Sequence, residues 1–116
     1  MKRKQGIVIF VLDTSLGKPA PGIPVELQRL TEKMDWEVLA RGDTDKAGCI
    51  KNLVSEDFTL DAGRYRLVYE TSVYFQQMGA VPCFPHIEVE FYLPNNEPIV
   101  LPLLISPFAY STYRGS

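Results

Sequence analysis

One histidine, two cysteines and a C-terminal arginine are the side chains with the most potential for chemistry in this 116-residue sequence. The histidine, His86, shares the polar side of an alternating segment with Glu88 and Glu90, so we expect it to be solvated rather than to act as a base. Cys49 follows a glycine in a predicted loop. Only two lysines lie near it in sequence, whereas a nucleophilic cysteine needs a close cation or a helix N-terminus. Local sequence alone therefore favours a structural or incidental role for Cys49.

The C-terminal segment, Tyr110 to Ser116, combines aromatic rings, hydroxyls and one guanidinium group. Tyr113 and Arg114 could together clamp a planar anionic or carbonyl-bearing ligand, because guanidinium is a rigid fork that also stacks on rings. Chain ends also fray, and the composition fits a disordered end equally well. The segment alone does not decide between these two outcomes.

The scarcity of histidine and cysteine excludes several kinds of site. A structural zinc site needs four ligands, and neither Cys-x-x-Cys nor His-x-x-x-His spacing occurs, so we expect no metal and no cofactor. A Ser-His-Asp or Cys-His mechanism would have to use His86. The chain has twelve basic and fourteen acidic residues and no basic stripe, which makes it a poor candidate for binding nucleic acid.

No apolar stretch approaches the roughly 18 residues of a membrane span. The basic start at 1–5 is followed by an apolar run at 7–12 that is too short for the core of a signal peptide. We therefore expect a cytoplasmic protein that does not enter a membrane. In such a reducing compartment Cys49 and Cys83 are expected to be free thiols rather than a disulfide.

Glycine and proline punctuate short apolar or alternating runs, a pattern typical of strands. The run at 6–12 is continuously apolar, which predicts a strand buried on both faces. Another apolar run, at 99–105, contains Pro102, which demands an edge strand, a bulge or an interruption. Helical spacing occurs at 71–78, with Gly79 as a stop. With alternating strands at 23–30, 36–40, 64–70 and 86–93, the chain is predicted to be one all-β domain over 1–116, a sandwich of about eight strands with one short helix.

Segments at both ends of the chain carry a family resemblance. Val11 to Ala20, followed by Gly22 to Leu27, resembles the opening signature of the transthyretin-like 5-hydroxyisourate hydrolases. Residues 103–116 resemble their closing signature, of which the final Tyr-Arg-Gly-Ser is the most specific part. The resemblance covers essentially the whole chain. It implies a transthyretin-like (prealbumin-like) β-sandwich, assembled as a homotetramer whose dimer–dimer interface forms a channel for a small-molecule ligand.

Three positions depart from what this resemblance leads us to expect. The family's hydrolases carry a histidine where this chain has Phe10, an arginine where it has Cys49, and a histidine where it has Val100. The resemblance thus implies that the groups credited with activating water and holding the urate-like ring are gone, and His86 aligns with neither lost histidine. Loss of one such group typically costs about 10²–10⁴-fold in rate. We therefore expect no hydrolysis of 5-hydroxyisourate.

Two interpretations of function remain. In the first, the channel cyclises, isomerises or rearranges a small hydrophobic carbonyl-bearing metabolite. The catalytic residues would then be Arg114, Ser116 and Cys49, and the ligand-binding residues Phe10, Val100, Ser111 and Tyr113. In the second, the protein only binds such a molecule, as the transthyretin branch of the family does. The Tyr-Arg-Gly-Ser ending favours the first, because the transthyretin branch has lost it.

Overall fold

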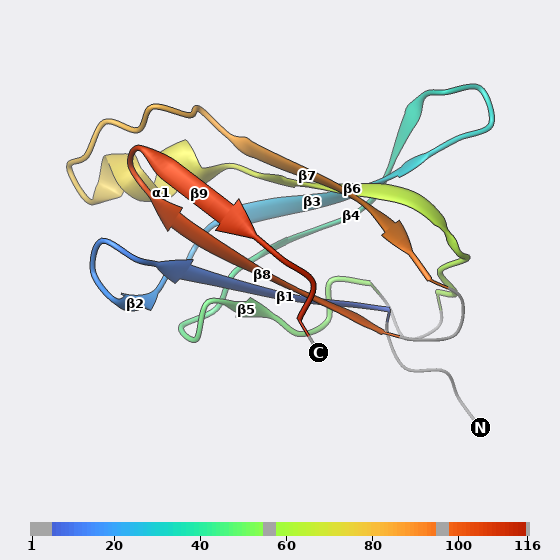
Figure 1. Cartoon of the computed structure of the whole chain (residues 1–116), viewed down its shortest axis with the longest axis horizontal. Coiled ribbons are helices and arrows are strands. Elements are labelled where there is room, and N and C mark those ends of the chain that lie inside the picture. Colours follow the sequence, from blue (N-terminus) through green and yellow to red (C-terminus); the bar gives the residue numbers. More distant parts are fainter. Residues whose placement is uncertain (1–5, 55–57, 95–97, 116) are drawn as a thin grey trace.

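Two β-sheets packed face to face make up the protein (Figure 1). The computed structural model describes residues 6–54, 58–94 and 98–115. These residues form one helix, α1 (Thr71–Gln77), and nine strands. The strands are β1 (Ile7–Asp13), β2 (Lys18–Pro19), β3 (Pro24–Leu30), β4 (Trp36–Asp43), β5 (Cys49–Ile50), β6 (Gly63–Tyr69), β7 (Ile87–Leu93), β8 (Ile99–Ser106) and β9 (Ala109–Thr112).

The strands are divided between two sheets, which we name A and B. Sheet A has the order β2-β1-β8-β9, and β5 also pairs with β1. Sheet B has the order β4-β3-β6-β7. The pairing of β1 with β8 is parallel, and the other pairings between the described strands are antiparallel. The predicted all-β sandwich with one short helix is thus confirmed.

The hydrophobic core lies between the inner faces of the two sheets. Ile9 and Leu103 from sheet A and Leu27, Leu67 and Tyr69 from sheet B are all fully buried there. Because successive side chains of a strand point to opposite faces, the residues between these core positions point outward. Each sheet therefore presents an outer face with its own character.

Strand β1 differs from the prediction that it is buried on both faces. Its inner residues are buried, but Val8 is 43% exposed and Phe10 and Leu12 are only half-buried. The expectation of two-sided burial was wrong for the single chain, because the described part of the chain leaves much of the outer side of β1 exposed. A strand this apolar on its outer side is typical of one that is covered by something else.

Pro102 accounts for an interruption between β8 and β9. The C=O of Val100 accepts a hydrogen bond from the C-terminal tail. Backbone groups two residues apart in a strand face the same neighbour, so the nitrogen of Pro102 also faces β9 and the tail. A proline nitrogen cannot donate, and regular pairing with β9 ends at Thr112. The Thr112 hydroxyl donates instead to the Pro102 C=O at 2.7 Å. Strand β8 itself runs unbroken through Pro102 and is not an edge strand, so what stops near the proline is only the regular pairing with β9, and the tail beyond Thr112 leaves the ladder.

Helix α1 ends within one residue of its predicted boundary. It covers Thr71–Gln77, and Gly79 follows with a φ of +73°, a conformation that favours glycine. The Tyr74 hydroxyl donates to the buried Asp13 carboxylate at 2.7 Å, which attaches the helix to the end of β1. Among the described residues, no helix is long and apolar enough to cross a membrane.

Candidate functional site

A tight turn places Cys49 at the start of β5. One carboxylate oxygen of Asp45 accepts hydrogen bonds from the backbone N–H groups of Ala47 and Cys49, at 2.9 and 3.0 Å. Gly48 has a φ of +75°, and a Cβ there would lie 2.4 Å from the carbonyl oxygen of Val11. Only glycine permits this approach of the turn to β1. The turn thereby fixes the thiol beside the outer face of sheet A.

The strand register brings Phe10, Cys49 and Val100 to one patch. Phe10 is directly opposite Cys49 on one side and opposite Pro102 of β8 on the other. Val100 lies two residues before Pro102 and is opposite Val8. Paired residues of neighbouring strands point to the same face, so these side chains share the outer face of sheet A. Sequence alone could not give this register, because it depends on the parallel pairing of strands some 90 residues apart.

The C-terminal tail is held against this patch. Gly115 donates its N–H to the Val100 C=O at 2.7 Å and forms an isolated antiparallel bridge with it. A Cβ at Gly115 would lie 3.2 Å from Cγ1 of Val100, so residue 115 lies directly beside the valine side chain. Figure 1 shows the C-terminal trace continuing beyond β9 and bending across β8. The frayed end considered from composition is therefore not what the structure shows as far as Gly115.

The remaining predicted site residues follow from this arrangement. Tyr113 and Arg114 precede the bridge and are exposed. Ser111 is exposed on β9, opposite Leu104. Ser116 lies outside the described residues. The structure thus brings six of the seven predicted residues to sheet A and its tail, while their roles in binding or catalysis stay predictions.

The outer face of sheet A is apolar at its centre. We name as the apolar face six outward-pointing residues of β1 and β8: Val8, Phe10, Leu12, Val100, Pro102 and Leu104. Leu12, Pro102 and Leu104 were missed as site residues, because the parallel pairing that places them beside Phe10 and Val100 is not visible in the sequence. Within these described strands the face carries no histidine and no carboxylate. Polar side chains border it at Cys49, which pairs with Phe10, and at Ser111, which pairs with Leu104.

Comparisons with known proteins agree with this geometry. The model of the HIUase/Transthyretin family matches residues 7–115. That match covers nearly the whole chain. The chain belongs to this family. A 5-hydroxyisourate hydrolase from Salmonella dublin is 41% identical over 109 residues, which are 93% of this chain and 79% of that protein.

Solved structures of the HIUase/Transthyretin family match from both of its branches. Sea bream transthyretin in complex with thyroxine superposes with a TM-score of 0.90 at 31% identity, covering 96% of this chain and 95% of that one. The 5-hydroxyisourate hydrolase of Klebsiella pneumoniae gives a TM-score of 0.83 at 34% identity, covering 100% and 97%. The transthyretin-like fold and the family resemblance are therefore confirmed. The likeness to both branches leaves the activity to be argued from the site.

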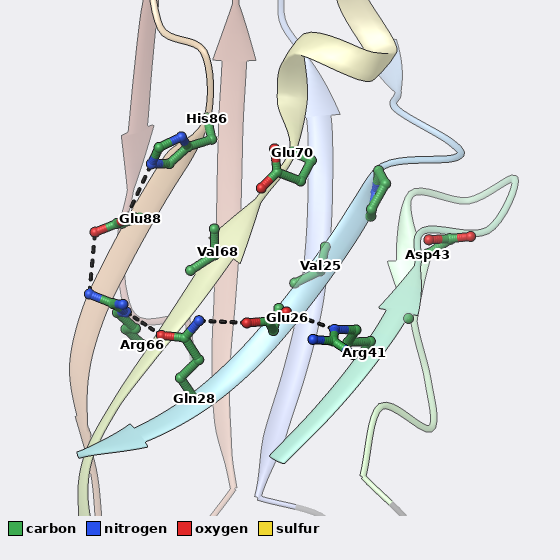
Figure 2. A pocket seen from close by; sticks show the side chains of 12 residues that line it. Val25, Glu26, Gln28, Arg41, Asp43, Arg66, Val68, Glu70, His86 and Glu88 are labelled. Atoms are coloured by element: carbon green, nitrogen blue, oxygen red, sulfur yellow. Dashed lines mark hydrogen bonds and ion pairs between the residues drawn. The ribbon is translucent and has the colours of Figure 1, made fainter. Parts of the chain in front are cut away.

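His86 lies away from the apolar face, in a groove on the outer face of sheet B (Figure 2). Its Nε2 is 3.2 Å from a carboxylate oxygen of Glu88, and its side chain is exposed, as predicted for a solvated histidine. Glu90, expected on the same side of the strand, does not contact His86 but pairs with Arg64. His86 is therefore no candidate for chemistry on sheet A.

The two cysteines are both free. Cys49 is half-buried at the edge of the apolar face, and Cys83 is exposed in the segment between α1 and β7. Among the described residues, no group of three or more histidine, cysteine or acidic side chains is placed to hold a metal ion.

Proposed function

We propose that this chain does not hydrolyse 5-hydroxyisourate and that its apolar face binds, and cyclises, isomerises or rearranges, a small hydrophobic carbonyl-bearing molecule. One observation carries the proposal. Phe10 and Cys49 are direct cross-strand partners, and Val100 is on the neighbouring strand β8, bridged to Gly115 of the tail that bears Arg114, so the three departures from the family pattern meet in one patch. Had these three positions been far apart in the fold, their replacement would not have changed the chemistry of a single site.

The chemistry of the apolar face opposes hydrolysis. Opening an amide-like ring bond with water needs a base of near-neutral pKa and a stabiliser for the oxyanion. Phe10 and Val100 supply neither. Transfer of a polar purine-derived anion onto an apolar surface without hydrogen-bond partners is also unfavourable. Both binding and activation of the ancestral substrate are therefore expected to fail.

The margin of the face suits a different reaction. The Arg114 guanidinium is proposed to polarise a ligand carbonyl or to stabilise an enolate, with Tyr113, Ser111 and Ser116 beside it. Cys49 is proposed to act as a weak acid or as a nucleophile. In an isomerisation the Cys49 thiolate is proposed to accept the proton from one carbon, and the thiol so formed to return it to another, so the reaction needs neither an oxidant nor a cofactor.

Self-association would close the site. The apolar face includes Val8, at 43% exposure, and the half-buried Phe10 and Leu104, and a single chain leaves them uncovered. We propose a homotetramer in which such faces meet across a channel and exclude water from the ligand. Exclusion of water strengthens the interaction of Arg114 with a carbonyl.

Binding without catalysis is the second candidate function. The observation that favours it is the TM-score of 0.90 to a transthyretin in complex with thyroxine. The lack of a histidine or carboxylate on the described apolar face points the same way. Under this alternative, the hydrophobic ligand would fill the channel and leave unchanged.

Substitution of Arg114 separates the two candidates. Purified protein would be incubated with a panel of α,β-unsaturated ketones and cyclic 1,3-diketones, with binding followed by thermal shift and conversion by mass spectrometry. If the protein is an enzyme, Arg114→Ala abolishes conversion, and the matched control Arg64→Ala on sheet B does not. Cys49→Ala then shows whether the thiol takes part. If wild type binds panel members without converting any, and Arg114→Ala only alters affinity, the binding function holds instead.

A further inference from the structure

The groove on the outer face of sheet B is a second concave surface, separate from the apolar face of sheet A. It has a volume of about 460 Å³, within the usual size of pockets for small molecules. Strands β3, β4, β6 and β7 all contribute to it, and Val68 of β6 lies near its middle (Figure 2). The groove therefore offers one apolar side chain, Val68, at the middle of a mostly polar surface on a four-stranded sheet.

One wall of the groove is a row of polar side chains that satisfy one another. Arg41 and Gln28 donate to the two carboxylate oxygens of Glu26, at 2.7 and 2.6 Å. Arg66 donates to Gln28 and pairs with Glu88 at 3.6 Å. Hydrogen bonds from Arg41 and Gln28, opposed by burial, hold the pKa of Glu26 below its usual value. With two arginines and two glutamates, this wall carries no net charge.

The opposite side of the groove is acidic. Asp43 and Glu70 line it, and neither carboxylate forms a hydrogen bond or ion pair with a side chain among the described residues. Glu70 occupies the N-cap position of α1, yet its side chain makes no capping hydrogen bond and lies on the groove side (Figure 2). Four acidic residues against two arginines give the lining a charge of −2, equal to the formal net charge of the whole chain.

We infer that this groove binds a small organic cation, an alkyl amine whose apolar stem lies over Val68 and whose ammonium group pairs with Glu70 or Asp43. The neutral wall does not repel a cation, because each of its arginines is paired with a carboxylate. An anion would meet two uncommitted carboxylates, and a neutral alcohol would gain no ion pair. The groove thus distinguishes ligands by charge and by the presence of a short apolar body.

The test uses 1,4-diaminobutane and n-butylamine, with 1,4-butanediol as the neutral match. In a titration followed by ¹⁵N–¹H spectra at low ionic strength, the amines shift the backbone signals of Val68, Glu70 and Asp43 to saturation, and butanediol does not. Glu70→Gln and Asp43→Asn each weaken amine binding by about twofold to fivefold, as for partly exposed ion pairs. Glu32→Gln, which removes the same charge from the exposed turn after β3, leaves affinity unchanged.

Three results would each overturn the inference. They are the absence of saturable shifts at these groove residues with either amine, equal binding of butanediol, and an effect of Glu32→Gln as large as that of Glu70→Gln. The last would mean that amines respond only to the overall charge of the chain. None of these measurements involves the apolar face, so their failure would leave the proposed function of sheet A untouched.

Discussion

Two tyrosines in the core illustrate how single polar atoms affect this fold. Tyr74 donates its hydroxyl hydrogen to Asp13, which also accepts hydrogen bonds from the Ser15 hydroxyl and backbone. Tyr69, fully buried two residues before α1, has a hydroxyl with no partner among the described residues, and burial raises its pKa. A buried hydrogen bond to a charged group stabilises, whereas a buried unsatisfied hydroxyl costs free energy. The two positions should therefore respond in opposite directions to the same substitution.

Tyr74→Phe is expected to lower the free energy of unfolding by about 1.5–3 kcal/mol, because it leaves one oxygen of the buried Asp13 carboxylate without a partner.

Burial raises the pKa of Asp13, but the hydrogen bonds from Ser15, Tyr74 and Leu16 outweigh it, so the pKa lies below 3.8. The contribution of Asp13 is thus complete above about pH 4 and is lost as pH falls through the lowered pKa. In urea unfolding between pH 2 and 7, the free energy of unfolding should fall less at acid pH for Asp13→Asn than for wild type. Asp35→Asn, in an exposed turn, serves as the control and should match wild type.

Tyr69→Phe is expected to leave the free energy of unfolding unchanged or to raise it by up to about 1 kcal/mol, because it removes a hydroxyl that has no described partner. Urea unfolding at pH 7, beside Tyr74→Phe, measures both effects under the same conditions. A loss of stability equal to that of Tyr74→Phe would show that the Tyr69 hydroxyl is satisfied in solution.

The junction of β8 with the C-terminal tail decides where Arg114 lies. Pro102 ends regular pairing with β9 at Thr112, and the bridge from Gly115 to Val100 then holds the tail on the sheet. Arg114 is therefore positioned by its neighbours on both sides rather than by a regular strand. The size of residues 100 and 115 should control this position.

Gly115→Ala is expected to displace the tail, because the new Cβ would lie 3.2 Å from Cγ1 of Val100. Hydrogen exchange of the amide of residue 115 should accelerate by about tenfold or more, while exchange in β1 and β8 stays unchanged. The double variant Val100→Ala with Gly115→Ala makes room for the methyl group and should restore protection. Unchanged exchange in the single variant would show that residue 115 does not lie beside Val100.

Much of the element order followed from sequence, whereas the grouping of residues did not. Gly79 and the helical spacing before it located α1, and Pro102 predicted an interruption, because these signals are local. The exposure of the outer side of β1 was not predicted. Val8, Phe10 and Leu12 are as apolar as the inner residues, so the sequence does not alternate and does not show which face the chain itself buries. Charged residues of four strands meet in the sheet B groove only through register, which a single sequence does not display.

At the scale of the molecule, the two outer faces have opposite characters. Sheet A presents an apolar centre with polar margins, and sheet B presents rows of paired charges. A charged outer face is stable in water by itself, but an apolar one is typical of an interface. Association is therefore expected through sheet A and not through the outer face of sheet B.

Leu104→Glu should lower the molar mass measured by light scattering from that of a tetramer to that of a smaller species, because a carboxylate on the apolar face cannot be buried unpaired. Val38→Glu places the same charge at a 45% exposed position of β4 in sheet B and should leave the mass unchanged. Circular dichroism confirms that both variants are folded. A monomeric wild type, or equal disruption by Val38→Glu, would contradict association through sheet A.

The loss of hydrolase activity is tested by the rate at which 5-hydroxyisourate disappears, followed by absorbance. The unmodified chain should not accelerate the spontaneous decay, while the Salmonella dublin hydrolase, 41% identical, serves as the positive control. The variant Phe10→His with Cys49→Arg and Val100→His restores the proton-transfer and anion-binding groups and should gain about 10²-fold or more over the unmodified chain. Turnover by the unmodified chain within about tenfold of the control enzyme would contradict the account, because each lost group alone should cost more than that.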